Sequence, residues 1–196
     1  MTRDTAHIFD MVFKRLIRLS SGAVVQLINS LFDANHPLDS TVEYPNTETV
    51  SDKLRKLMSD AMIVINGTHV YNIESEIGYD AGIVIRIFEY GYAEALRSMA
   101  VSENGAAVDL TFPNARVIYW EARAPEKLTL RMHFPDGSWH SYEVPTFNFL
   151  AHSVAELEER KLTMLLPFYV LKLRKRLERA ASSTAAMENL RRPMLL

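Results

Sequence analysis

Three acidic residues surround a short β-favouring stretch and could together hold a metal ion. Asp60 precedes the apolar run 61–65, and Glu74 and Glu76 follow the run 68–73. Because side chains alternate between the two faces of a strand, Glu74 and Glu76 should point the same way. Mg²⁺ prefers carboxylate oxygens, and a bound Mg²⁺ polarises a phosphate and activates a water. Spacing alone also fits solvated acids at strand ends, which are the commoner case.

The link between the two runs decides whether the acids can share a site. Asn66-Gly67 between two β-rich runs predicts a hairpin, and its first run, apolar on both faces, predicts a buried central strand. A two-residue turn would put Asp60 and Glu74 on opposite faces. A three-residue loop at 65–67, with a left-handed glycine, would restore a shared face. We predict this offset.

A helix expected over residues 80–100 carries the next candidates. Arg86, Tyr90, Glu94 and Arg97 lie on one of its faces, so Arg86 could approach the acids and contact a phosphate. The alternative is a solvated face on which Glu94 pairs with Arg97.

Two further groups of cations could follow a DNA backbone, since phosphate contacts supply most non-specific affinity. One is Lys14 with Arg15 and Arg18, and the other is the basic run 172–179. An ordinary solvated face is the alternative for both. The six histidines show no metal-binding spacing, and Trp120 and Trp139 are interpreted as core or interface residues.

The elements that must position these residues follow from periodicity and turn signals. Two helical pieces are expected over 7–32 with a break at Ser20-Ser21-Gly22, then an edge strand within 40–50. After the acidic hairpin and the 80–100 helix come strands at 106–112 and 116–120 and a hairpin of 128–134 with 139–144. A capping box at Ser153 and Glu156 predicts a long helix to about residue 180, kinked at Pro167. This order predicts an α+β fold with a mixed sheet.

Composition narrows the function classes. The 196 residues are 48% hydrophobic and 23% charged, which is typical of a folded domain. The chain has no cysteine, which excludes disulfides, thiolate metal sites and cysteine nucleophiles. With a net charge of −2, any phosphate-binding surface must be local. The absence of a signal-peptide pattern and of a long apolar run predicts a cytoplasmic protein without membrane contact.

The stretch 59–76 resembles the core of PD-(D/E)XK nucleases, in which an Asp, a strand and Glu-X-Lys follow one another. It is most similar to the recombination-promoting nuclease/transposase (Rpn) family, where Gln commonly replaces the Lys. The resemblance covers roughly residues 8–180. Its further motifs are Phe13-Lys14, Leu38-Asp-Ser-Thr41, Arg86-Ile-Phe-Glu-Tyr-Gly-Tyr92, Val144-Pro-Thr-Phe147, Leu166-Pro-Phe168 and Leu171-Lys-Leu-Arg-Lys175.

The resemblance implies a Mg²⁺- or Mn²⁺-dependent DNA endonuclease linked to recombination or transposition. Asp60 and Glu74 would be the metal ligands, Glu76 a third catalytic residue, and Lys14 and Arg86 nucleic-acid contacts. It further implies a restriction-endonuclease-like αβββαβ core in a domain at 1–150, with a helical appendage at 151–196 packed on it. Glu76 departs from the pattern, because it occupies the Lys/Gln position, where a carboxylate without metal would repel phosphate.

Two alternative functions stay open at this point. A catalytically weak or inactive relative would bind nucleic acid or regulate a partner. A protein-interaction module would instead work through the C-terminal helix, which could also form a homodimer.

Overall fold

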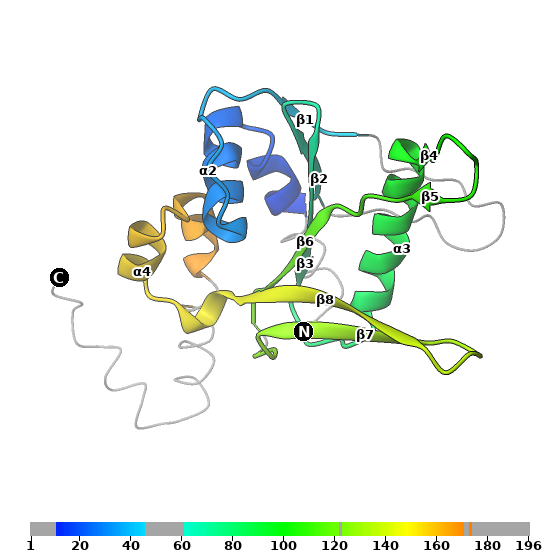
Figure 1. The fold of residues 1–196 in the computed structure, drawn as a ribbon. Helices are drawn as coiled ribbons and strands as arrows, with labels where there is room; N and C mark the ends of the chain where they lie inside the picture. Colours follow the sequence, from blue (N-terminus) through cyan, green and yellow to red (C-terminus); the bar gives the residue numbers. More distant parts are fainter. Residues whose placement is uncertain (1–10, 46–60, 122, 171–172, 174–196) are drawn as a thin grey trace, which may run out of the picture.

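A six-stranded mixed sheet lies at the centre of the fold in the computed structural model (Figure 1). The structure describes residues 11–45, 61–121, 123–170 and 173. The strand order is β1-β2-β3-β6-β8-β7. The strands are β1 (Val42–Glu43), β2 (Ala61–Ile65), β3 (His69–Glu76), β6 (Asn114–Tyr119), β7 (Lys127–His133) and β8 (Trp139–Asn148). The central β3, β6 and β8 are parallel, and the other neighbours are antiparallel. The predicted α+β class with a mixed sheet is confirmed.

Helices cover the two faces of this sheet unequally. One face carries a helical segment at 11–16, α2 (Ser21–Phe32), α4 (Val154–Glu159) and the 3-10 helix η3 (Thr163–Tyr169). The other face carries α3 (Ile83–Ala95), which continues into η1 (Leu96–Ser98). Figure 1 shows the sheet between α2 and α4 on one side and α3 on the other. The first is called the α2 face below, and the second the α3 face.

Each face has its own hydrophobic core. On the α2 face Trp120, which is 1% exposed, stacks on Phe168 at 4.2 Å between ring centroids. Leu157 and Leu165 lie in the same cluster, so α4 and η3 contribute to the main core. On the α3 face, Ile87 packs in a smaller cluster with strand residues such as Val117 and Val144. The interpretation of Trp120 as a core residue is confirmed, whereas Trp139 is 58% exposed.

Local sequence signals account for most of the elements. Ser20 caps α2 by accepting a hydrogen bond from the Ala23 N–H at 3.4 Å, and the break between the two predicted helical pieces lies at 17–20. The second hairpin is formed by β7 and β8 around Gly137, whose φ is 83°. Pro145 is tolerated in β8 because the ladder with β6 begins only at Thr146.

The predicted long C-terminal helix begins where expected but is wrong beyond Glu159. The capping box at Ser153 and Glu156 is present, but α4 ends at Glu159. Lys161 then adopts a left-handed φ of 56°, and the Leu162 N–H bonds back to the Leu157 carbonyl at 2.7 Å. This reversal lets the next apolar residues enter the core as a 3-10 helix. Residues 174–180 lie outside the described residues.

Two smaller expectations need correction. The strand expected at 106–112 is reduced to β5 (Val108–Asp109), which pairs with β4 (Ala100–Val101) in a separate two-stranded sheet. The edge strand expected within 40–50 is the two-residue β1; residues 46–50 lie outside the described part. No described helix is long and apolar enough to cross a membrane.

Candidate active site on the central hairpin

The loop between β2 and β3 has the odd length that a shared acidic site requires. Ile65 pairs with His69, so the loop contains three residues, Asn66 to Thr68. Asn66 and Gly67 are both left-handed, with φ of 54° and 69°. The predicted offset is confirmed, although the loop begins one residue later than expected. Asn66 fixes the loop by accepting the Thr41 N–H at 3.1 Å and donating its own N–H to the Thr41 carbonyl at 3.1 Å.

The register of the hairpin determines which face of the sheet each acidic residue lies on. It runs from Ile65↔His69 to Ala61↔Ile73, where the described part of β2 begins. Glu74 follows Ile73 directly along β3. Asp60, the other predicted metal ligand, lies outside the described residues, so its position remains a prediction.

Glu74 and Glu76 occupy the central strand and face α3. Their register partners on β6 are Val117 and Tyr119, which both belong to the core of the α3 face. Glu74 is only 3% exposed, whereas the side chain of Glu76 is 24% exposed. A buried carboxylate loses its hydration, and proteins retain one where it is paired or has a function. The predicted common facing of the two acids is confirmed.

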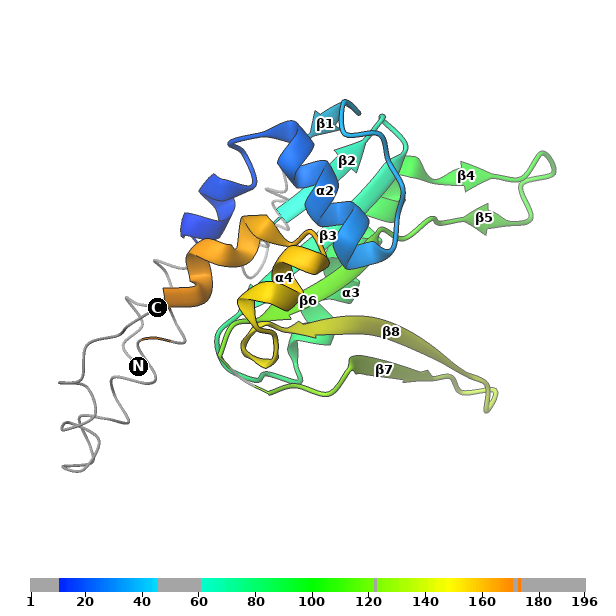
Figure 2. The same ribbon diagram turned by 90° about the vertical axis from the view of Figure 1, so that its left-hand side faces the viewer.

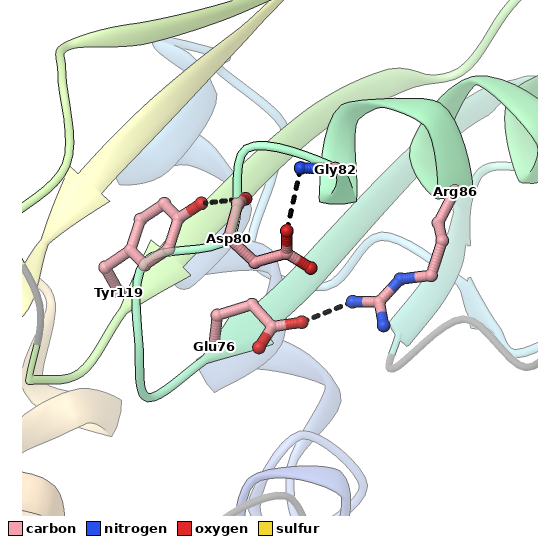
Figure 3. A network of polar contacts seen from close by, with 5 residues as sticks. All are labelled: Glu76, Asp80, Gly82, Arg86 and Tyr119. Atoms are coloured by element: carbon pink, nitrogen blue, oxygen red, sulfur yellow. Dashed lines mark hydrogen bonds and ion pairs between the residues drawn. The ribbon is translucent and has the colours of Figure 1, made fainter.

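Arg86 reaches these acids from the first half of α3. Its guanidinium donates to a carboxylate oxygen of Glu76 in an ion pair (Figure 3). Burial alone would lower the pKa of Arg86, but the charges of Glu76 and then Glu74 outweigh it and raise that pKa. The structure thus brings together three of the predicted residues, Glu74, Glu76 and Arg86.

The start of α3 is held beside Glu76 by residues that the sequence analysis missed. Asp80 accepts the Gly82 N–H at 2.8 Å, and the Tyr119 hydroxyl donates to the Asp80 carbonyl at 3.2 Å (Figure 3). Burial and then the charge of Glu76 raise the pKa of Tyr119 to about 12, so this hydroxyl stays a donor. Asp80-Ala-Gly82 carries an Asx-turn signal that could have indicated this turn.

The remaining candidates lie elsewhere or stay predictions. Lys14 is half-buried in the helical segment 11–16, next to Phe13 of the α2-face core, and its predicted contact with nucleic acid remains a prediction. Glu94 does pair with Arg97, at 3.1 Å. His36 and His69, which are distant in sequence, lie 4.9 Å apart between ring centroids. His69 begins β3 and Glu76 ends it, so this histidine pair lies at the loop end of the hairpin.

Among the described residues, no group of three or more His, Cys, Asp or Glu side chains has the spacing to hold a metal ion. A third carboxylate beside Glu74 and Glu76 would therefore have to come from outside the described residues, where Asp60 lies. Comparisons of the chain with protein-family models, with curated proteins and with solved structures gave no match.

Proposed function

We propose that this protein is a metal-dependent DNA endonuclease of the PD-(D/E)XK type that hydrolyses phosphodiester bonds. The observation that carries the proposal is the burial of Glu74. This carboxylate is 3% exposed in the central strand, and it shares its face with Glu76 and the guanidinium of Arg86. An apolar side chain would be more favourable at a core position, because desolvating a carboxylate costs on the order of several kcal/mol. Its retention there favours a functional role.

The donor types fit Mg²⁺ or Mn²⁺. Both are hard cations that take carboxylate oxygens, and Glu74 and Glu76 provide these on one face. Asp60 precedes Ala61, and Ala61 pairs with Ile73. If the same register continued for one residue, Asp60 would lie opposite Glu74. We therefore propose Asp60 and Glu74 as the metal ligands. The chemistry that a bound Mg²⁺ supplies is polarisation of a phosphate and activation of a water.

Arg86 offsets the departure of Glu76 from the nuclease pattern. Without a counter-charge, Glu76 would repel a phosphate that approaches Glu74. The ion pair with Arg86 neutralises that carboxylate. A guanidinium has five N–H donors, so Arg86 can bind Glu76 and still offer donors to a phosphate oxygen. We propose that Glu76 assists in binding the metal or the attacking water, and that Arg86 and Lys14 contact the DNA backbone.

The similarity to the Rpn family extends the proposal to a cytoplasmic nuclease that acts in recombination or transposition. In that case the sheet and α3 would correspond to the restriction-endonuclease-like αβββαβ core. The order of β2, β3, α3 and β6 in the chain supports this correspondence.

A second candidate is a catalytically weak or inactive relative that binds nucleic acid or regulates a partner. The Glu76–Arg86 ion pair favours it, because it engages the side chain that stands at the Lys/Gln position of the pattern. The third hypothesis, an interaction module or homodimer formed through the C-terminal helix, depends mainly on residues 174–196, which lie outside the described part.

The deciding experiment is cleavage of supercoiled plasmid with Mg²⁺ or Mn²⁺. The parent is compared with Asp60→Asn and Glu74→Gln, which keep side-chain size while removing charge. Asp109→Asn, at an exposed position of β5, is the matched control. We expect cleavage by the parent and the control and none by the two site variants. Mg²⁺ binding measured by calorimetry should be lost in the same two variants.

Other results separate the alternatives. Equal cleavage by all four proteins would place the activity elsewhere or in a contaminant. A parent that binds Mg²⁺ and DNA without cleaving would favour the inactive relative. A parent that binds neither would refute the endonuclease proposal.

A further inference from the structure

The α2 face of the sheet is uncovered over β7 and over β8 as far as Pro145. Leu128 and Leu130 of β7 turn toward the α3-face core, so the alternate residues of β7 project to the other side. In Figure 2, the β7–β8 ribbon lies below α2 and α4 with no helix in front of it. All the residues of the two strands that project to this side, from the turn up to Pro145, are exposed: Lys127, Thr129, Arg131, His133, Trp139, Ser141, Glu143 and Pro145.

Basic side chains gather on this surface. Lys127, Arg131 and His133 follow one another along β7, and alternate residues of a strand are about 6.8 Å apart. Arg116 of β6 belongs to the same surface. It precedes Val117, the partner of Thr146, and so stands beside Pro145, whose other neighbour is Lys127. We call Arg116, Lys127, Arg131, His133 and Arg160 the cationic sheet face.

Arg160 reaches the surface from the end of α4. Its guanidinium carbon lies 5.4 Å from the ring centroid of Phe147, which is on the α2 face beside Ile118. Arg116 is placed in the same manner, 5.5 Å from the ring centroid of Phe32. Stacking on a ring fixes the plane of a guanidinium and leaves its N–H edge for an anion.

The two arginines are close enough to repel each other. Burial lowers the pKa of Arg116; the charge of Asp33 opposes this shift, and the charge of Arg160 adds to it. The buried Nε of Arg116 has no hydrogen-bond partner among the described residues. No described carboxylate lies within ion-pairing distance of Arg116, Arg131 or Arg160. The nearby acid Glu143 is occupied by Lys127, whose Nζ lies 2.7 Å from its carboxylate.

From this arrangement we infer that the cationic sheet face is a second phosphate-binding surface, which holds the backbone of a single-stranded nucleic acid. Lys127, Arg131 and Arg160 would contact successive phosphates. Trp139, which is 58% exposed beside its partner His133, would stack on a base. The surface lies on the opposite side of the sheet from Glu74 and Glu76, so its binding does not require the proposed cleavage.

A second copy of the chain fits this surface less well. β7 is the edge strand of the sheet, so two copies could pair through it. Antiparallel pairing about a two-fold axis at Leu130 would bring the two Arg131 side chains close together. Like charges in such positions destabilise a sheet. A polyanion is the better match.

The test measures binding in EDTA, where metal-dependent cleavage cannot occur. Fluorescence anisotropy of a labelled single-stranded oligonucleotide is followed against salt for the parent, Arg131→Gln, Arg160→Gln and their double variant. Arg97→Gln removes the same charge in η1, beyond the C-terminal end of α3, and is the matched control. Arg116 is left intact because it is half-buried.

We expect each single variant to weaken binding and to reduce the salt slope by about 0.7, and the double variant by about 1.4, as for lost phosphate contacts to a single strand. Arg97→Gln should match the parent. Glu143→Gln should strengthen binding, because it frees Lys127 from its ion pair. Tryptophan fluorescence should be quenched on binding in the parent and not in Trp139→Ala.

Two results would overturn the inference. One is a double variant that binds the oligonucleotide as tightly as the parent does, or a parent that does not bind it at all. The other is displacement of the oligonucleotide by poly-glutamate as readily as by unlabelled oligonucleotide, which would mean that the surface recognises only negative charge. Loss of plasmid cleavage in the Asp60 and Glu74 variants bears on the nuclease proposal alone, since these variants keep the cationic sheet face.

Discussion

Replacing Arg86 by Gln tests whether this arginine is the counter-charge of the acidic pair. The change removes the partner of Glu76 and leaves Glu76 and the buried Glu74 on one face without it. Gln keeps part of the packing of the side chain. The expected result is a loss of stability that reflects charge more than volume.

The degree of burial sets the size of the effect. Exposed ion pairs contribute about 0.2–1 kcal/mol, whereas removing one partner of a buried pair costs about 3–5 kcal/mol. The side chains of Arg86 and Glu76 are 42% and 24% exposed, which lies between these cases and calls for a discount for solvent screening. We therefore expect a cost of about 1–2 kcal/mol, and a melting temperature lower by about 2–8 °C for a chain of this size.

Thermal and urea unfolding of four proteins would measure it: the parent, Arg86→Gln, Glu76→Gln/Arg86→Gln and the control Arg97→Gln. Arg97 also pairs with a glutamate, at 3.1 Å and with side chains 47% and 16% exposed, but as an i,i+3 pair of the kind that contributes about 0.2–0.5 kcal/mol. Arg86 differs from it because it also offsets the charge of the buried Glu74. The double variant should recover most of the loss, because it removes the unpaired charge of Glu76. If Arg86→Gln lost no more stability than Arg97→Gln, or if the double variant were less stable still, the reasoning would be refuted.

Mg²⁺ adds a second result to this experiment. A cation bound by the acids would replace the missing charge, so Mg²⁺ should raise the melting temperature of Arg86→Gln more than that of the parent. An equal effect on both proteins would contradict metal binding at Glu74 and Glu76. It would leave the ion-pair argument intact, since that argument is tested without metal.

Two further predictions concern His36, which lies beside His69 at the loop end of the hairpin, and Phe168 of η3. Burial and then the charge of His69 lower the pKa of His36 from 6.5, so the unfolded chain binds this proton more readily. The contribution of His36 to stability should therefore be fully present above about pH 6.5 and be lost as the pH falls below it. Between about pH 7.5 and about pH 5.5, the melting temperature of His36→Gln should fall less than that of the parent. Phe168 is 1% exposed and stacks on Trp120, so Phe168→Ala should lower the free energy of unfolding by about 3–5 kcal/mol. A cost below about 1 kcal/mol in urea unfolding would show that η3 is not part of the core.

The parts of the fold that were predicted correctly depend on local rules. Side-chain alternation and the Asn66-Gly67 signal are properties of a few adjacent residues, and they were enough to predict the hairpin and the common facing of Glu74 and Glu76. The odd loop was predicted from the requirement that Asp60 and Glu74 share a face. The capping box at Ser153 is equally local. The position at which α4 ends does not follow from local rules. It depends on how Leu162 and Phe168 fit beside Trp120, a residue that is distant in sequence, and the helical spacing of the segment carries no information on that contact.

The cationic sheet face could not be predicted from the sequence either, because its residues are brought together only by the fold. Arg116, Lys127, Arg131 and Arg160 belong to two strands and the end of a helix, so no window of sequence shows them together. Only the register places Arg116 beside Pro145 and Lys127. The net charge of −2 gave no sign of such a surface, because it sums the charges of the whole chain. Glu74 and Glu76 are on the opposite face, so charges of opposite sign are separated by the sheet itself. A phosphate backbone attracted by one face would therefore meet the carboxylates of the other only where Arg86, and a bound cation, offset their charge.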